Sequence, residues 1–293
     1  MPLGETAALA TAFCWAATSV AFAEASRRAG ALRVNLLRLP MALVLLSLAL
    51  LLSRSPLAAL TASSFGFLAA SAVIGLVVGD LALFAALHRI GPRLASLVMS
   101  SAPMFATLAG ALFLGEEPGA RALGGMVLTL GGVVWVVAER PGQPLEGVKR
   151  RAGVLLAFAA AACQGVGLAL AKLGMAGGVP PLAATWLRIG IATAVIWLLT
   201  LLTGKLVGLG LRGALRHAFV YLALGAFFGP FAGVWLSLVA AHHTSVGVAA
   251  TIMATTPLLV IPLVMATERY HPSIRAVAGT LVALAGVALL FSR

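Results

Sequence analysis

The stretch APMFATLAGALFLGEEPGARALGGMVLTLGGV at residues 102–133 returns in altered form as TPLLVIPLVMATERYHPSIRAVAGTLVALAGV at residues 256–287. Both stretches contain a proline after a small residue, an apolar run, a glutamate and a second apolar run marked by glycines. Identical residues stand 154 positions apart in and just before these stretches: His88 and His242, Pro103 and Pro257, Arg121 and Arg275, Gly125 and Gly279, Gly132 and Gly286. Chance does not readily give such an ordered series, so it indicates an internal repeat.

The repeat extends toward the start of each half at an offset of about 150 residues. Leu37-Arg38-Leu39 corresponds to Leu187-Arg188-Ile189, and two glycine pairs follow at the same offset, Gly75 with Gly225 and Gly79 with Gly229. Each half contains an odd number of predicted membrane spans, so the second copy must begin on the opposite side of the bilayer. The repeat is therefore predicted to be inverted, which is typical of alternating-access transporters.

The composition is that of a membrane protein with many spans. Hydrophobic residues make up 61% of the chain and charged residues 10%, against about 45–50% and about 25% in soluble domains. The net charge of +12 does not indicate nucleic acid, because the basic residues stand in short loops between apolar runs. Cys14 and Cys163 lie inside apolar runs and match neither a metal motif nor a disulfide framework.

The apolar runs predict ten spans, each near the length of about 20 residues that crosses the hydrocarbon core. They lie at 4–26, 35–53, 64–87, 93–114, 119–138, 152–175, 182–203, 217–241, 245–266 and 273–291. We therefore expect an all-α membrane protein of two inverted five-helix repeats. The repeats are residues 1–138 and 152–293, joined by a cytoplasmic linker at 139–151.

Basic residues are distributed unevenly between the two sides that this topology creates. Fourteen follow the odd-numbered spans: Arg27, Arg28, Arg33, Arg89, Arg93, Arg140, Lys149, Arg150, Arg151, Lys205, Arg212, Arg216, Arg269 and Arg275. Three fall on the other side: Arg54, Arg121 and Arg293. The positive-inside rule places the first set in the cytoplasm and both termini outside. Two parallel repeats with accidental differences in loop charge are the alternative.

The end of each half carries a family resemblance. Ala102-Pro103-Met104 precedes Leu114-Gly115-Glu116-Glu117, and Thr256-Pro257-Leu258 precedes Thr267-Glu268, each followed by a last span rich in glycine. This arrangement resembles the drug/metabolite transporter superfamily, EamA type, over nearly the whole chain, and within it the YddG-type exporters of amino acids and related metabolites. The resemblance implies one central cavity surrounded by spans 1, 3, 4, 6, 8 and 9, with spans 5 and 10 in support. Members are often described with cytoplasmic termini, whereas the charge distribution here predicts the reverse.

Spans 4 and 9 carry hydroxyl residues just before a proline: Ser100 before Pro103, and Thr251 and Thr255 before Pro257. Proline lacks a backbone N–H and frees a carbonyl about one turn earlier. Inside a membrane that carbonyl must face protein or a water-filled cavity. We expect the prolines to act as kinks or gates and the hydroxyls to bind substrate. The alternative is a packing kink whose hydroxyls bond back to their own helix.

Asp80 is a carboxylate deep inside a predicted span. Such groups are costly in a membrane and are usually functional. We expect Asp80 to contact substrate and to be a candidate for proton coupling, because burial disfavours the anion. A structural hydrogen bond or a pair with an arginine is the alternative. The corresponding position in the second half is Pro230, so any coupling would be asymmetric.

Further substrate-binding candidates are neutral. Trp15, Thr18 and Ser19 share span 1, Gln164 lies in span 6 and Trp235 in span 8. Their indole, hydroxyl and amide groups suit a small, partly apolar solute that is zwitterionic or neutral.

Two cations and a set of glycines complete the candidates. Arg188 and Lys172 fall near the outer ends of their spans, where long side chains usually reach for the interface. Anchoring of a substrate carboxylate at the outer mouth is the alternative. The glycines of the last span in each half are spaced for close helix contact, so we expect a packing surface between the halves. They are Gly124, Gly125, Gly131 and Gly132 in the first half and Gly279 and Gly286 in the second.

No catalytic spacing, metal cluster or phosphate loop stands out in the sequence, so we expect no catalytic site, metal or cofactor. The predicted function is alternating-access export of small amino acid-like or related metabolites across a bacterial inner membrane. The expected partners are the bilayer, a small-molecule substrate and, as a candidate, protons, with no nucleic acid and a monomer favoured. Two alternatives to this function remain. One is an intramembrane lipid-modifying enzyme, which would need clustered acids or histidines at one membrane face. The other is a channel or facilitator, which would need a ring of like groups.

Overall fold

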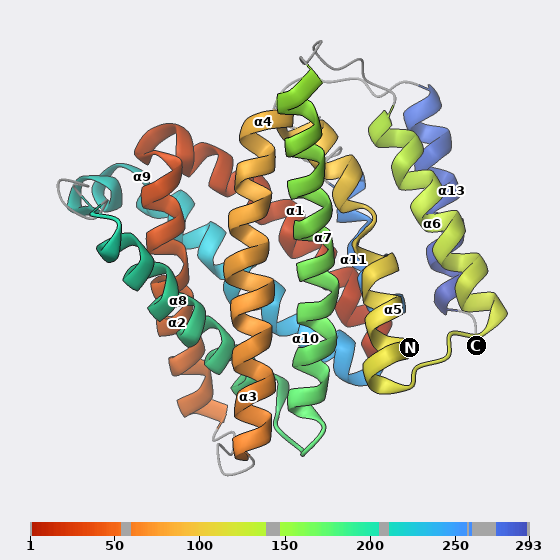
Figure 1. Ribbon diagram of the computed structural model, residues 1–293, viewed down its shortest axis with the longest axis horizontal. Helices are drawn as coiled ribbons and strands as arrows, with labels where there is room; N and C mark the ends of the chain where they lie inside the picture. Colours follow the sequence, from red (N-terminus) through yellow and green to blue (C-terminus); the bar gives the residue numbers. More distant parts are fainter. Residues whose placement is uncertain are drawn as a thin grey trace.

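The computed structural model describes residues 2–53, 60–138, 147–204, 211–256, 258–259 and 274–291. Its regular structure within these ranges is helical throughout (Figure 1). The elements are α1 (Leu3–Ala29), α2 (Ala31–Ser53), α3 (Ala62–Ser71), the π-helical segment η1 (Ala72–Val78), α4 (Gly79–Met99), α5 (Ala102–Leu114), α6 (Ala120–Ala138), α7 (Gly147–Met175), α8 (Pro181–Leu202), α9 (Leu211–Ala226), the π-helical segment η2 (Phe227–Gly233), α10 (Val234–His243), α11 (Val246–Met253) and α13 (Ile274–Phe291).

Six helical stretches in the described part of the chain are long and apolar enough to cross a membrane. They are Leu3–Ala29, Leu32–Ser53, Ala62–Leu87, Arg151–Met175, Pro181–Leu202 and Arg216–His243. Three further apolar helices are shorter: Ala102–Leu114, Ala120–Trp135 and Val277–Leu290. Large aliphatic side chains such as Leu51 and Leu112 are exposed on the outer surface, as expected where lipid replaces water. The chain is therefore an all-helical, multi-pass membrane protein.

Glycines in the left-handed region end two of the helices. Gly30, with φ of 87°, follows α1, and Gly115, with φ of 64°, follows α5. A side chain at either position would be strained, whereas glycine adopts this conformation freely. The turn at Gly115 sets Glu116 directly beyond the end of α5.

The chain reverses direction after the middle of α4. Gly79 lies against Cys163 of α7, and Ile90 lies against Gly153, nearer the start of α7. Gly165 then lies against Ala106 of α5, which shows that the chain has returned along α7. The reversal therefore lies between Ile90 and Ala106, and helical geometry continues to Met99 across the boundary between spans that was predicted at Gly91-Pro92. The regular helix is interrupted at Ser100 and Ser101, just before Pro103.

Helices of the two halves pair in a matching way. The α3–η1–α4 stretch packs antiparallel on α7, and α9–η2–α10 packs on α1, while α2 packs on α8 and α6 on α13. Gly75 approaches Gly167 of α7, and its sequence mate Gly225 approaches the Phe22 ring of α1. Figure 1 shows α6 and α13 side by side at one edge of the molecule, with the chain ends marked at the same end of the bundle.

The predicted glycine surface forms at Gly125, Gly132 and Gly286, whereas a Cβ at Gly131 would have no neighbour within 4 Å. A Cβ at Gly132 would stand 2.5 Å from the Ala283 backbone nitrogen of α13, and a Cβ at Gly286 would collide with the backbone of Thr129. Gly125 faces the Leu290 side chain. The last helices of the two halves are thus in backbone contact.

The interruptions in the fourth and ninth predicted spans have the same backbone hydrogen bonds. Ser101 N donates to Val98 O (3.0 Å), and 154 positions later Thr255 N donates to Ile252 O (3.1 Å). A second pair of bonds follows, from Met104 N to Ser101 O and from Leu258 N to Thr255 O, both 2.9 Å. Similar sequence thus gives a similar local break in each half.

Candidate functional site

A cavity of about 340 Å³ lies between the helices of both halves. Its walls come from α1, η1, α4, α5, α7, α8, α10 and α11 and the break that precedes α5. Its polar lining residues are Trp15, Asp80, Ser100, Gln164, Arg188, Ser237 and Thr256. Most of the remaining wall is aliphatic or glycine, including Gly75, Leu83, Leu168, Val234 and Met253. An apolar cavity with a few convergent polar groups is the usual form of a small-molecule site.

Four of the predicted substrate-binding residues reach this cavity: Trp15, Asp80, Ser100 and Gln164. They come from α1, α4, the break before α5, and α7, so residues up to 149 positions apart in the sequence meet at one place. Trp15 is held against Gly233, where a Cβ would stand 2.8 Å from the indole nitrogen. The close approach of α10's N-terminal end to α1 thus fixes the indole at the cavity wall.

Five other predicted residues do not line the cavity. Thr18 donates to Gly225 O (2.7 Å), which joins α1 to α9, and Ser19 is exposed and donates to Ala16 O (2.7 Å). Trp235 packs in an apolar cluster, with its ring centroid 6.1 Å from that of Phe231. The Thr251 and Thr255 hydroxyls are buried and bond back to Gly247 O and Ile252 O of their own segment. In the conformation described, none of these five side chains borders the cavity, so their contact with a solute stays a prediction.

Of the two prolines, Pro103 lies in the first turn of α5 and is buried. A proline at this position loses no helical hydrogen bond, because the first N–H groups of a helix have no partner in any case. The break that it accompanies contributes Ser100 and Ala102 to the cavity wall. Pro257 lies outside the described residues. Thr256, just before it, lines the cavity and donates its hydroxyl to Met253 O (2.7 Å).

Asp80 forms an ion pair with Arg38 Nη2, and Arg38 Nε donates to Asn35 Oδ1 (2.9 Å). Both charged side chains are largely enclosed, with 15% of Arg38 and 22% of Asp80 exposed. The arginine pair that was the alternative for Asp80 is therefore what the structure shows. This pair neutralises the charge of Arg38 and links α2 to the start of α4.

Arg188 lies deeper than the sequence suggested. The residue is only 4% exposed, borders the cavity and places Nη2 3.6 Å from the position of a Cβ on Gly75. Its Nε is buried without a hydrogen-bond partner. The expectation that Arg188 reaches out to the membrane interface is therefore wrong. Its burial follows from the packing of α8 on η1, which a count of residues along the helix does not give.

Packed side chains close the cavity at the end of the bundle where the chain starts. A cluster of buried apolar residues joins the start of α1, the ends of α5, α7 and α10 and the starts of α8 and α11. Its members include Ala8, Ala109, Met175, Ala183, Ala241 and Ala249, nearly all with no exposed surface. Leu168 and Met253 belong both to this cluster and to the cavity wall. A solute could therefore leave toward this end only if the cluster opened.

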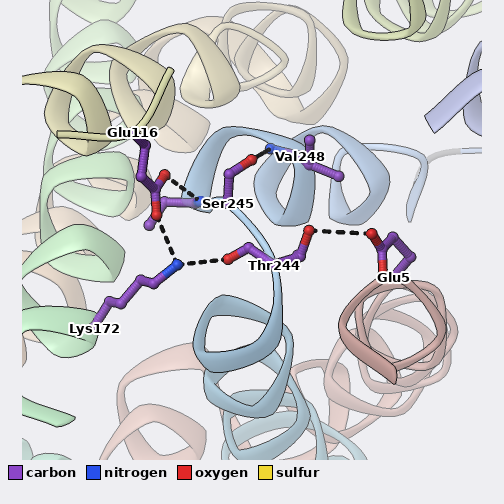
Figure 2. Close-up of polar contacts among 7 residues, drawn as sticks. Glu5, Glu116, Lys172, Thr244, Ser245 and Val248 are labelled. Carbon is purple, nitrogen blue, oxygen red and sulfur yellow. Dashed lines mark hydrogen bonds and ion pairs between the residues drawn. The ribbon is translucent and has the colours of Figure 1, made fainter. Parts of the chain in front are cut away.

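A polar network lies beside this cluster (Figure 2). Lys172 Nζ donates to Glu116 Oε1 and to Thr244 O, both at 2.7 Å. Glu116 Oε2 accepts from Val246 N (2.8 Å) at the N-terminus of α11, where a carboxylate is favoured. Thr244 Oγ1 in turn donates to Glu5 Oε1 (3.2 Å) of α1. Lys172 does not line the cavity, and the network ties both halves together.

The fit around Glu116 explains two glycines in the predicted motif. A Cβ at Gly110 would stand 2.6 Å from Glu116 Oε2, so glycine leaves room for the carboxylate beside α5. Gly115 provides the left-handed turn before it. The sequence marked Glu116 as part of a family motif, and its contacts supply the physical reason.

A family model supports the same division of the chain into halves. The model of the EamA-like transporter family matches residues 2–138 and again residues 151–292. The chain belongs to the EamA-like transporter family. The superfamily and type inferred from the repeated motifs are thereby confirmed.

One solved structure shows the same fold as this EamA-like protein. It is described as "Crystal structure of protein" and aligns with a TM-score of 0.79 at 19% sequence identity. The alignment covers 99% of this chain and 97% of the other. At this identity the likeness concerns the fold alone. No curated protein matches the chain.

Within the described ranges of this EamA-like protein, no group of three or more His, Cys, Asp or Glu side chains could hold a metal ion. Cys14 and Cys163 are free thiols. The lining residues of the cavity offer hydrogen bonding, charge pairing and apolar contact.

Proposed function

We propose that this EamA-like protein is an alternating-access secondary transporter that exports small amino acid-like or related metabolites. The observation that carries the proposal is the cavity, whose wall is built from both halves of the chain. The contacts that seal it at one end also join the two halves. A solute held between two such halves can change sides when they tilt against each other. No catalytic role is assigned to the site.

The proposal includes ten spans in two inverted repeats. The matching helix pairs support it, as do the matching breaks at Ser101 and Thr255. The family model's two matches, one in each half, point the same way. In this arrangement α6 and α13 form a supporting pair at the edge, and one chain encloses the cavity, which favours a monomer.

The charge distribution orients the protein in a bacterial inner membrane with its termini outside. Glu117, just after α5, would then face outward and Thr203, just after α8, would face the cytoplasm; both residues are exposed. Single cysteines at these positions, in a background lacking Cys14 and Cys163, test this with an impermeant maleimide added to intact cells. Labelling at position 203 and not at 117 would reverse the orientation while leaving the fold intact.

The cavity suits solutes with an apolar body and a few polar groups, such as the substrates of the YddG-type exporters. Proton coupling is proposed to run through Asp80. Protonation would discharge the carboxylate and release Arg38, so the contact between α2 and α4 would depend on the proton. This supplies a physical link between a pH gradient and a helix position.

Counterflow in proteoliposomes tests the proposed function. Vesicles preloaded with an unlabelled mixture of amino acids should transiently accumulate a labelled member of that mixture, with and without a pH gradient. A channel would equilibrate the label without concentrating it. Absence of counterflow for every amino acid would overturn the proposed substrate class.

A further inference from the structure

The two arginines of the repeated motif have different environments. Arg38 and Arg188 occupy equivalent positions in Leu37-Arg38-Leu39 and Leu187-Arg188-Ile189. In the first half, Arg38 Nε is satisfied by Asn35, and its Nη2 by Asp80. In the second half, the residues at the positions equivalent to Asn35 and Asp80 do not bind Arg188 in this way.

The residue that replaces Asn35 is Thr185, and the one that replaces Asp80 is Pro230. The Thr185 hydroxyl is already committed, since it donates to Pro181 O (2.7 Å). Proline offers no side-chain acceptor. Among the described residues, no carboxylate lies within ion-pair distance of Arg188, and its Nε has no hydrogen-bond partner.

A buried guanidinium without a counter-ion is costly, because the charge has lost water without gaining an anion. Arg188 is 96% buried, since its exposed fraction is 4%, and it borders the cavity beside Gly75. Its five N–H donors in a planar fork match a carboxylate, which can accept two parallel hydrogen bonds. Because no described carboxylate supplies the missing negative charge, a bound ligand that carries a carboxylate would supply it.

We propose that Arg188 is the anion-recognition group of the cavity and that it binds the carboxylate of the transported solute. The inference rests on the proposed transport function and narrows its substrate to solutes that carry a carboxylate. The Arg188 guanidinium forms an ion pair with the solute's carboxylate, as Arg38 does with the carboxylate of Asp80. The apolar walls at Leu83, Leu168 and Val234 accept the rest of the molecule.

The charge balance of the cavity agrees with this assignment. Asp80 also borders the cavity, but its charge is matched by Arg38. The ion pair of Arg38 and Asp80 has no net charge, so Arg188 leaves one positive charge at the cavity, which one carboxylate would neutralise. A solute with a carboxylate and an apolar body fits this balance better than a cation does.

The test is thermal stabilisation of the purified full chain by matched ligand pairs. The pairs are L-phenylalanine and L-phenylalaninamide, L-leucine and L-leucinamide, and 3-phenylpropanoate and 3-phenylpropanamide. Each pair keeps the apolar body and removes only the negative charge. We expect stabilisation by carboxylates and weaker affinity, by roughly 30-fold or more, for the amides. Equal stabilisation by an amide, or none by any of the carboxylates, would overturn the proposal.

Variants place the effect at Arg188. Arg188→Gln should remove the preference for the carboxylate of each pair, and Arg188→Lys should retain part of it because the charge remains while the fork is lost. Arg216→Gln is the matched control, since it removes an equivalent charge from an exposed position. An unchanged preference in Arg188→Gln would refute the assignment. If neither Arg188 variant folds, the comparison of ligand pairs on the natural chain still decides.

A counterflow assay distinguishes the failure of this inference from the failure of the proposed transport function. Carboxylate binding that depends on Arg188, without counterflow, would leave the anion site standing and overturn the transport proposal. Counterflow of a neutral amide as fast as that of its carboxylate would leave transport standing and overturn the role of Arg188.

Discussion

Glu116→Gln should open the sealed end of the cavity. The carboxylate of Glu116 contacts Lys172 Nζ at 2.7 Å and Val246 N at 2.8 Å. Glutamine keeps the shape and can still accept from Val246, but it cannot pair with the ammonium group. The closed arrangement would therefore lose an ion pair and a favourable charge at the start of α11 while its apolar packing stays intact.

The size of the effect follows from the enclosure of the pair. Lys172 is 22% exposed and Glu116 15%, so the pair lies between a surface ion pair and a fully buried one. Surface pairs contribute about 0.2–1 kcal/mol and the loss of a buried partner about 3–5 kcal/mol. We expect about 2 kcal/mol, which raises the population of the open form about 30-fold where the closed form dominates.

Labelling of a cysteine in the cavity measures this population. Ser237 borders the cavity, is 5% exposed, and accepts a cysteine with little change of size. In a background without Cys14 and Cys163, an impermeant maleimide would be added to the side of the membrane that carries the termini. The labelling rate at position 237 should rise about 30-fold in Glu116→Gln, because the rate follows the open population when closing is fast.

Glu117→Gln is the control, since it removes the same charge one residue away at an exposed position. Lys172→Met should reproduce the effect of Glu116→Gln, and the two changes together should add little, because they remove the same contact. A labelling rate in Glu116→Gln no faster than in Glu117→Gln would refute the idea that this network holds the end closed.

Substitutions at three other sites test separate contacts, and Gly131→Ala is the control for the first of them. Gly132→Ala should lower the free energy of unfolding by about 1–3 kcal/mol through overpacking, because the methyl group would meet a backbone nitrogen of α13 at 2.5 Å. Gly131→Ala, with nothing within 4 Å, should leave the thermal midpoint unchanged or raise it. Asp80→Asn should abolish accumulation driven by a pH gradient yet retain solute exchange in proteoliposomes, and loss of both would make the pair with Arg38 structural. Pro103→Ala should reduce counterflow more than the amount of protein in the membrane, because a new N–H allows α5 to extend into the break at the cavity.

The sequence predicted those features that local physics controls. Apolar runs of sufficient length predicted the helices. The stripe containing Gly132 and Gly286 predicted backbone contact between helices, because only small residues permit such an approach. In each case the residue type alone restricts what the chain can do.

The direction in which a side chain points was harder to predict. Thr251 and Thr255 were assigned to the cavity, but their hydroxyls bond to their own segment. In a soluble helix the polar face reveals the outer side, whereas a span that is apolar all round leaves its rotation undetermined. Only packing against neighbouring helices sets that rotation, which is why Thr256 lines the cavity and Thr255 does not.

The depth of Arg188 could have been inferred from the repeat. The equivalent residue in the first half, Arg38, contacts Asn35 and Asp80. The positions equivalent to these two partners in the second half are Thr185 and Pro230. A comparison of the halves, position by position, would have shown that Arg188 lacks residues equivalent to the partners of Arg38. Counting residues from the end of the span placed it at the interface.

The departures from internal symmetry coincide with the places where the two sides of a transporter must differ. The glycines that let helices approach, and the backbone bonds at the two breaks, are shared by both halves and set the common scaffold. The arginine pair with Asp80 and the closure at Lys172 occur in one copy each, since the corresponding residues are Pro230 and Phe22. A perfectly symmetric protein would have equal energies for its two facing states and would favour no direction of opening. Because one end alone is held by Lys172 and Glu116, the closed state of that end gains stability that the repeat itself cannot supply, and a ligand at Arg188 can then shift the balance only by binding the two states unequally.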